Sequence, residues 1–273
     1  MGGFKIEQGI HYKLTSEKIS YDDDAHDLMA EIEDKSFWFK HRNEVIKIVS
    51  ENYLLNKQIY DIGGGNGFVT KYFQDLKYDI TMIEPGIKGV INAKKRGVEK
   101  IYCCTVDEME FDNGSVDGFI FFDVLEHIKE DRIFLENLHL KLKQDGIIVM
   151  TVPAKKCLWS EEDEIAGHYR RYEKLEIEKI LEESGYKLLF SSYFFEYLVV
   201  PIFLLRRIKL KFSKKINAEK YREKAKKQHR SKADKNLRAL EFLNMRELNR
   251  LKNGKTINIG SSLIVVAQKK DLD

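Results

Sequence analysis

The sequence has few cysteines, few prolines and no long apolar run. Three cysteines occur in 273 residues; Cys103 and Cys104 are adjacent, and Cys157 stands apart. This excludes a disulfide framework or a repeated CxxC metal motif and is typical of a reducing compartment. The longest apolar stretch, Tyr197 to Leu205, is much shorter than the ~20 residues of a membrane-spanning helix. With no apolar leader in MGGFKIEQGIHYKL, we expect a cytoplasmic protein.

The net charge of +3 conceals an uneven distribution. Residues 205–255 contain 19 Lys and Arg against 5 Asp and Glu, a surplus of +14, so the rest of the chain carries −11. A basic segment is therefore attached to an acidic body. Residues 216–251 lack proline and contain strong or neutral helix formers, which predicts one long or two consecutive charged helices.

Strand-like and helix-like segments alternate from residue 58 to residue 153. The predicted strands are QIYDI, YDITMIE, KIYCC, VDGFIFFD and GIIVMTVP, and the helices among them are FVTKYFQDL, GIKGVINAKKRG and EDRIFLENLHLKL. This alternation predicts right-handed crossovers and a parallel sheet with helices on both faces, a doubly wound α/β domain. A helix ending at Gly185 and the strands YKLLFSSYFF and SSLIVVAQKK follow.

These patterns predict four parts. Residues 1–55 form N-terminal helices and part of a cap, and residues 56–195 form the ligand-binding core. Residues 196–256 form a basic helical insertion that acts as a cap or lid, and residues 257–273 return as the last strand of the core.

A glycine-rich turn, DIGGGNG, directly follows the first core strand. In a doubly wound sheet, ligands bind beyond the carboxyl ends of the strands, where a bare backbone lets them approach a helix N-terminus. Glycines 63, 65 and 67 form G-x-G-x-G, but residue 68 is Phe, so the G-x-G-x-x-G dinucleotide fingerprint is absent. No Gly-Lys-Ser/Thr follows, which excludes a P-loop. The spacing favours another nucleoside cofactor.

Three motifs in order resemble those of class I S-adenosylmethionine-dependent methyltransferases. They are DIGGGNG, the acid at the strand end in TMIEPG, and VDEMEFDNGSVDGFIFFDVLEHI, within residues 56–153. The resemblance implies a Rossmann-like sheet of seven mostly parallel strands, the last antiparallel, and S-adenosyl-L-methionine as cofactor. The stretch VPAKKCLWSEEDEIAGHYRRY and the segment after it resemble a bacterial subgroup of small-molecule methyltransferases, of type 11 or 12, often linked to cell-surface or lipid-linked biosynthesis.

The resemblance also implies roles in cofactor binding. Asp61 would orient the glycine loop and meet the cationic methionine end, and Glu84 would accept hydrogen bonds from both ribose hydroxyls, strengthened by its charge. Asp107 is expected at the adenine, with Thr105 as the rival, and Asp123 should face the cofactor and the transferred methyl. The complete set implied for the cofactor is Asp61, Gly63, Gly64, Gly65, Gly67, Glu84, Val106, Asp107 and Asp123.

The loop GHYRRY supplies the residues expected at the methyl acceptor. His168 is the candidate general base for a protonated acceptor, and Arg170 and Arg171 are candidate anion clamps, with Tyr172 beside them as a further substrate contact. Alternatively, these arginines pair with the acidic stretch SEEDE just upstream. His127 suits a structural role better than a catalytic one. No histidine or carboxylate cluster shows metal-ligand spacing, so no metal ligands are assigned, and whether a metal assists stays open.

The apolar strip from Tyr197 to Leu205 and its basic flank fit either a lid over the substrate cleft or a helix lying on the inner face of a membrane.

The favoured function is methyl transfer to an O or N atom of a small, anionic or lipid-linked metabolite. Two alternatives stay open: a non-catalytic protein of this fold that docks through its basic insertion on a membrane, nucleic acid or partner, and an RNA methyltransferase. The sequence DVLEH after the fourth strand argues against nucleic acid, because the Asn/Asp-Pro-Pro-aromatic motif of base-amine methyltransferases is absent.

Overall fold

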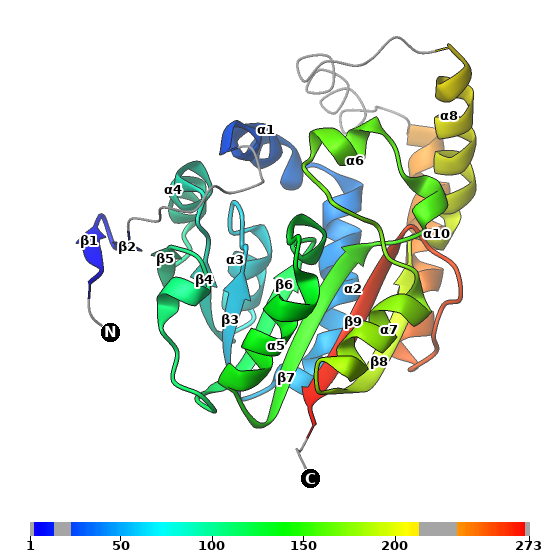
Figure 1. Cartoon of the computed structure of the whole chain (residues 1–273). Coiled ribbons are helices and arrows are strands. Elements are labelled where there is room, and N and C mark those ends of the chain that lie inside the picture. Colours follow the sequence, from blue (N-terminus) through cyan, green and yellow to red (C-terminus); the bar gives the residue numbers. More distant parts are fainter. Residues whose placement is uncertain (1–2, 14–22, 213–233, 271–273) are drawn as a thin grey trace.

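One twisted sheet with helices on both faces forms the body of the protein (Figure 1). The computed structural model describes residues 3–13, 23–212 and 234–270. Within them the sheet has nine strands in the order β1-β2-β5-β4-β3-β6-β7-β9-β8. The strands are β1 (Lys5–Glu7), β2 (Ile10–Tyr12), β3 (Gln58–Ile62), β4 (Asp79–Ile83), β5 (Ile101–Cys103), β6 (Val116–Phe122), β7 (Leu142–Pro153), β8 (Tyr186–Phe194) and β9 (Ser262–Lys269).

The central strands are parallel, and β9 runs antiparallel between β7 and β8. This arrangement confirms the predicted doubly wound class and the antiparallel last strand. The predicted count of seven strands was too low. Residues 5–12, which the sequence placed within the N-terminal helical part, form β1 and β2, and β2 extends the sheet by pairing in parallel with β5. The sequence signal was weak because each of these strands has only three residues.

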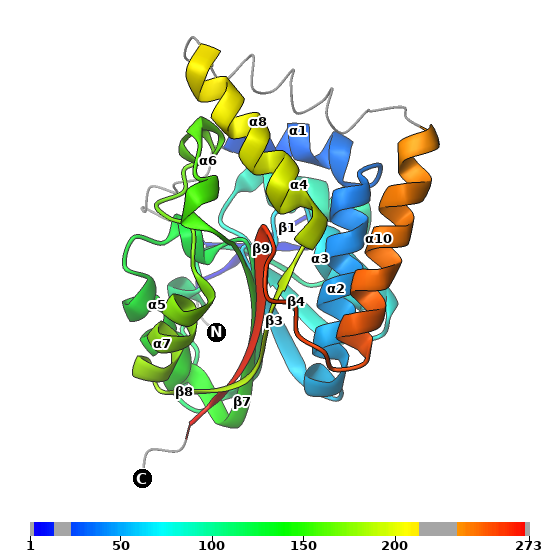
Figure 2. The same cartoon turned by 90° about the vertical axis from the view of Figure 1, so that its right-hand side faces the viewer.

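The helices form two layers. Figure 2 shows α5 and α7 on one side of the sheet, α2 and α3 on the other, and α10 outside α2. The α-helices are α1 (Asp23–Glu33), α2 (Phe37–Leu54), α3 (Phe68–Asp75), α4 (Ile87–Arg96), α5 (Asp131–Lys141), α6 (Glu161–Ile165), α7 (Lys174–Glu183), α8 (Val199–Phe212) and α10 (Asp234–Lys252), and short 3-10 turns are η1 (Asp107–Met109), η2 (Leu125–His127), η3 (Lys156–Leu158) and η4 (Glu196–Leu198).

Strand register brings the glycine turn and the acid of the second core strand together. Ile62, the last residue of β3, pairs with Ile83, the last residue of β4. The backbone N–H of Gly63 donates to the Ile83 carbonyl at 2.8 Å. Glu84, the next residue along the chain, therefore lies beside the turn at the carboxyl edge of the sheet, where this fold binds ligands.

Gly67 starts α3 and allows that helix to pack closely on α4. Its φ of +72° is left-handed, and an added Cβ would lie 2.8 Å from the Cβ of Ala93 and 2.7 Å from a methyl of Val98. Both the backbone conformation and the close approach require glycine here. Packing within the protein therefore accounts for glycine at this position. Gly67 does not line the cavity described below.

The basic insertion returns to the body next to α2. Glu247 of α10 is buried and bonds to the His41 ring at 2.7 Å, and it accepts hydrogen bonds from the backbone N–H groups of Phe195 and Glu196. This carboxylate ties α10 to α2 and to the end of β8. Residues 213–233 of the predicted helical insertion lie outside the described residues.

Helix α8 places Pro201 in its first turn. No intrahelical N–H bond is needed at that position, so proline is tolerated and the helix continues through it. Over the ranges that the structure describes, no helix combines the length and the apolar character needed to cross a membrane.

Candidate active site

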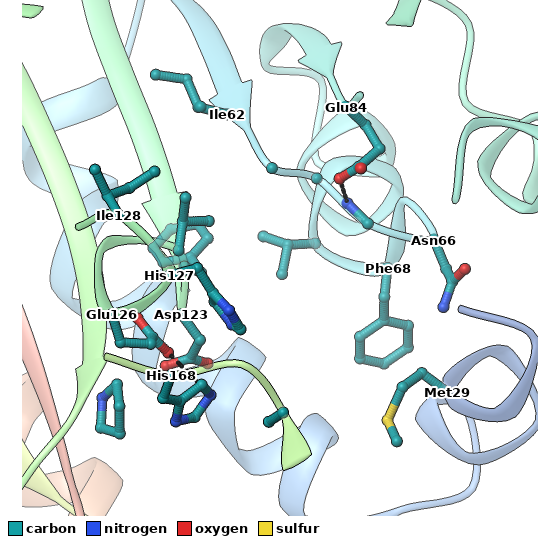
Figure 3. Close-up of a pocket in the computed structure, with 18 of the residues that line it drawn as sticks. Met29, Ile62, Asn66, Phe68, Glu84, Asp123, Glu126, His127, Ile128 and His168 are labelled. Atoms are coloured by element: carbon teal, nitrogen blue, oxygen red, sulfur yellow. Dashed lines mark hydrogen bonds and ion pairs between the residues drawn. The ribbon is translucent and has the colours of Figure 1, made fainter. Parts of the chain in front are cut away.

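A cavity of about 720 Å³ opens at the carboxyl ends of the central strands. It is bounded by the glycine turn and by segments from both ends of the chain, including α1, α2, α6 and α8. Figure 3 shows two groups of side chains across it, with Glu84, Asn66, Phe68 and Met29 on one side and Asp123, Glu126, His127 and His168 on the other. Ten of the predicted site residues line this cavity: Asp61, Gly63, Gly64, Gly65, Glu84, Val106, Asp107, Asp123, His168 and Arg171.

Glu84 and Gly65 form the centre of the cofactor side. One oxygen of the buried Glu84 carboxylate accepts the Gly65 N–H at 2.8 Å, drawn as the dashed line in Figure 3, and the other accepts the Gly86 N–H at 2.6 Å. A Cβ built on Gly65 would meet no protein atom closer than 4.0 Å, so the space beside this glycine is open cavity. A carboxylate fixed next to open space fits a ligand that presents hydroxyl donors, such as a ribose.

Asp61 lies below the glycine turn and is 2% exposed. Its carboxylate accepts a hydrogen bond from the Thr70 hydroxyl at 2.6 Å. Burial raises the pKa of Asp61 to about 7, while that hydrogen bond and the charge of Arg42 act in the opposite direction. A cationic group entering the cavity would favour the ionised carboxylate, which agrees with the role expected for Asp61.

Replacing Asp61 by asparagine should change how stability depends on pH in the ligand-free protein. A carboxyl group whose pKa rises from 3.8 to about 7 on folding binds more protons in the folded state. Its contribution to stability is therefore full below about pH 4 and is lost as pH rises through 7. Relative to Asp61→Asn, the wild type should lose up to about 4 kcal/mol of unfolding free energy between pH 4 and pH 8. Urea unfolding at several pH values measures the difference; parallel profiles would contradict the assignment.

The N-terminal helix α1 is fixed over the glycine turn by a polar network. The Asn66 side-chain amide donates to the His26 carbonyl and to Glu33. Arg96 of α4 donates to the Asn66 carbonyl at 3.0 Å and pairs with Glu33 at 2.8 Å. The side chains of His26, Met29 and Glu33 consequently line the cavity. The sequence predicted that N-terminal helices form part of a cap but did not identify these residues.

Arg42 of α2 reaches the end of β6. Its guanidinium pairs with Asp123 at 2.6 Å and lies 5.7 Å from the ring centroids of Trp38 and Phe122. Asp123 also accepts a hydrogen bond from Thr151 at 3.2 Å. Asp123 therefore lies at the cavity, as expected, and it is paired with a cation from the N-terminal helix α2. No local sequence motif indicated this pairing.

The candidate adenine contacts lie at η1. Thr105, Val106 and Asp107 all line the cavity. The Thr105 hydroxyl and N–H both donate to Glu108, at 3.0 Å and 2.7 Å, whereas Asp107 is exposed. Because Thr105 is engaged with Glu108, Asp107 remains the residue that we propose for the adenine amine.

Glu126, His127 and His168 cluster at the opposite side (Figure 3). Glu126 is fully buried, and the His127 and His168 ring centroids are 4.7 Å apart. Burial and the charge of Asp123 raise the pKa of Glu126 well above its usual value, while burial and His168 lower the pKa of His127 to about 4. The spacing of residues along the sequence did not reveal the cluster because His168 lies on a different loop. The Tyr169 N–H holds this loop in place by donating to the Glu126 carbonyl at 2.8 Å.

Asp163 organises the loop that carries His168. It bonds Nδ1 of His168 at 3.2 Å and two nitrogens of Arg171, each at 2.7 Å. Arg206 of α8 lies 3.6 Å from the same carboxylate. Burial acts to raise the pKa of Asp163, but the hydrogen bond with His168 and the charges of Arg171 and Arg206 lower it overall. The alternative prediction, in which the arginines of GHYRRY pair with SEEDE, therefore applies to Arg171. Arg171 also lines the cavity.

Arg170 and Tyr172 take positions away from the cavity lining. Arg170 pairs with Asp131 at 2.7 Å, and the buried Tyr172 donates its hydroxyl to the same carboxylate at 2.8 Å. Backbone alternation explains this placement, since neighbouring residues in an extended loop face opposite sides. Arg206, which the sequence analysis did not single out, lies in the cavity instead.

Comparisons with known proteins agree with this geometry. Residues 60–150 match the family model described as "Methyltransferase domain". A comparison with curated proteins gave no match. Among solved structures, a possible histamine N-methyltransferase from Thermotoga maritima is 12% identical, with a TM-score of 0.52 over 90% of this chain and 95% of that one. A methyltransferase from Archaeoglobus fulgidus is 17% identical, with a TM-score of 0.52 over 85% of this chain and all of that one.

Another similar structure is phosphoethanolamine N-methyltransferase 2 from Haemonchus contortus in complex with S-adenosyl-L-methionine. It is 17% identical, with a TM-score of 0.55 over 92% of this chain and 58% of that one. At these identities the structural matches show the fold, and the family model adds the methyltransferase assignment for the central strands and the glycine turn. The open space beside Gly65 and the fixed carboxylate of Glu84 fit S-adenosylmethionine as cofactor. Residues 60–150 therefore carry a methyltransferase domain, and the fold matches that of solved S-adenosylmethionine-dependent methyltransferases.

Proposed function

We propose that the protein transfers the methyl group of S-adenosylmethionine to an oxygen or nitrogen of a small anionic metabolite. The observation that carries the proposal is the composition of the cavity wall opposite Glu84, where Arg171, Arg206 and His168 meet. The cofactor supplies a methyl group already activated on a sulfonium, so the residues of this chain need only hold the acceptor in line and exclude water.

Arg206 is the residue that we propose as the clamp for the acceptor's anionic group. Its ion pairs with Glu162 and Asp163 are long, at 3.7 Å and 3.6 Å, and its buried Nη1 makes no hydrogen bond within the described part of the chain. A phosphate or carboxylate entering the cavity would satisfy this nitrogen with a charge-assisted bond. The phosphoethanolamine N-methyltransferase among the similar structures supports an acceptor of this kind.

His168 is suited to remove the acceptor's proton when the acceptor is a hydroxyl. Asp163 engages Nδ1, so Nε2 is the nitrogen that can accept a proton at the cavity. A base held in one orientation by a carboxylate is a recurring arrangement in proton transfer. Asp61, Glu84 and Asp107 would hold the cofactor at the opposite side of the same cavity.

More specifically, the anionic acceptor is lipid-linked. Helix α8 directs Ile202 and Arg206, four residues apart, into the cavity, while Val200, Leu204 and Leu205 are 63%, 53% and 59% exposed. An exposed apolar face beside an acceptor pocket, followed by a basic segment, suits an acceptor delivered from an anionic lipid surface. The same observations support peripheral contact at the inner face of a membrane.

A methyl-transfer screen tests the proposal. Formation of S-adenosylhomocysteine is measured with soluble phosphorylated and carboxylated metabolites and with lipid-linked acceptors in anionic vesicles. Arg206→Ala should raise the KM for the acceptor about 10- to 100-fold and leave S-adenosylhomocysteine affinity unchanged. Arg250→Ala, which removes an exposed ion pair with Glu196, is the matched control. Turnover only with neutral or cationic acceptors, or an unchanged KM in Arg206→Ala, would overturn the anionic assignment.

A further inference from the structure

Among the residues that the structure describes, Glu126 is a buried carboxylate whose oxygens have no hydrogen-bond partner. The residue is 0% exposed, and neither carboxylate oxygen forms a hydrogen bond in the described ranges. The guanidinium groups whose charges act on Glu126 already have partners, since Arg42 pairs with Asp123 and Arg171 pairs with Asp163. A buried carboxylate is strongly disfavoured as an unpaired anion, so a cation or a proton must neutralise it.

Two imidazoles converge on this carboxylate. Glu126, His127 and His168 each offer a ligand atom, and these atoms lie within 4.8 Å of one another. The distance from Nε2 of His168 to Oε1 of Glu126 is 3.9 Å. Ligand atoms in a tetrahedral zinc site are about 3.3 Å apart, given metal–ligand bonds of about 2.0–2.1 Å. Small side-chain rotations would bring the three groups to that spacing.

The groups behind the cluster match those that support metal ligands elsewhere. A metal-bound histidine usually bonds through its other ring nitrogen to a carboxylate, which fixes the ring. Here Asp163 bonds Nδ1 of His168 at 3.2 Å, and Arg171 holds Asp163 through two nitrogens at 2.7 Å. This support leaves Nε2 of His168 as the atom that faces Glu126.

We propose that Glu126, His127 and His168 bind one divalent transition-metal ion of the zinc class at the acceptor side of the cavity. Two imidazoles and one carboxylate leave an open coordination position, as in catalytic zinc sites. The consequence for methyl transfer rests on the proposed function. The open coordination position of the metal ion would receive the acceptor's oxygen, and His168 would then act as a metal ligand and not as a general base.

The chemical step remains balanced in this form. Coordination lowers the pKa of the acceptor hydroxyl, and its proton leaves to solvent. The oxygen–carbon bond forms as the carbon–sulfur bond of the cofactor breaks, so the sulfonium becomes a neutral thioether. No oxidant or reductant is needed.

Metal titration of the untagged, chelator-treated chain tests the site without an acceptor. Calorimetry with ZnCl₂ and visible absorption with CoCl₂ should each show one ion bound per chain. Glu126→Gln and His168→Asn should each weaken binding at least about tenfold, as should Asp163→Asn, which removes the support for His168. His139→Asn, at a buried histidine beside Tyr186 and outside the cavity, should bind as tightly as the wild type.

Titration with S-adenosylhomocysteine separates this inference from the proposed function. Variants that keep the wild-type affinity for this ligand are folded and retain the cofactor side, so a selective loss of metal supports the site. Absence of stoichiometric Zn²⁺ and Co²⁺ binding by the wild type would overturn it, as would unchanged affinity in both Glu126→Gln and His168→Asn. A proton would then accompany Glu126, and methyl transfer with His168 as base would stand unaffected.

Discussion

Replacing Glu84 by alanine should weaken the binding of S-adenosylhomocysteine about 100-fold or more. The buried carboxylate lies beside open cavity and is expected to accept both ribose hydroxyls of the cofactor. Two hydrogen bonds to a charged acceptor contribute about 3 kcal/mol or more together, which corresponds to a factor of about 100 or more in Kd. The same change frees the N–H groups of Gly65 and Gly86, so the turn also loses part of its preorganisation. Calorimetric titration measures the ratio.

Two further variants make the measurement specific to Glu84. Asp79→Ala alters an exposed acid at the opposite end of β4, where it pairs with Lys100, and should leave the affinity unchanged. Glu84→Gln keeps the size of the side chain but loses the charge, and it should lie between alanine and the wild type. An affinity of Glu84→Ala within twofold of the wild type would remove Glu84 from the ribose site.

Replacing Arg42 by methionine should destabilise the protein by about 2–4 kcal/mol, because the partly buried carboxylate of Asp123 loses its cation. Arg42 pairs with Asp123 at 2.6 Å and is itself buried. Its charge also opposes the raised pKa values of Asp61 and Glu126. Without it, three carboxyl groups would share the cavity floor with no cation from α2. The free energy of unfolding in urea measures the effect.

A double-mutant cycle with Asp123→Asn identifies the cause. If the lost charge pairing dominates, adding Asp123→Asn to Arg42→Met should recover a large part of the stability, because the uncompensated carboxylate disappears. If the loss comes from contacts with Trp38 and Phe122, the two changes should add. Additive effects would therefore contradict the electrostatic account.

The features that could be predicted from the sequence are those that depend on residues close together in the chain. The strands before and after the glycine turn and helix α3 are short apolar runs, so the predicted QIYDI and YDITMIE contain β3 and β4. Once strand order places their carboxyl ends together, the proximity of Gly65 and Glu84 follows from the fold. The cofactor side of the cavity is therefore largely a local property of the sequence.

The acceptor side depends on contacts between distant segments, which no local pattern records. Arg42 reaches Asp123 from α2, Arg206 reaches Asp163 from α8, and His168 meets Glu126 from a separate loop. Nothing in the stretch GHYRRY distinguishes the two adjacent arginines, Arg170 and Arg171. Their different partners follow from the loop conformation, which turns Arg170 toward Asp131 and Arg171 toward Asp163.

A crystal structure with S-adenosylhomocysteine tests the central claim most directly, because that claim assigns the two sides of one cavity to cofactor and acceptor. We predict that the ribose hydroxyls bond to Glu84 and that the sulfur faces Asp123, Glu126 and His168 across the cavity. A ligand bound outside the cavity, or with its ribose toward Glu126 and its sulfur toward solvent, would contradict the account.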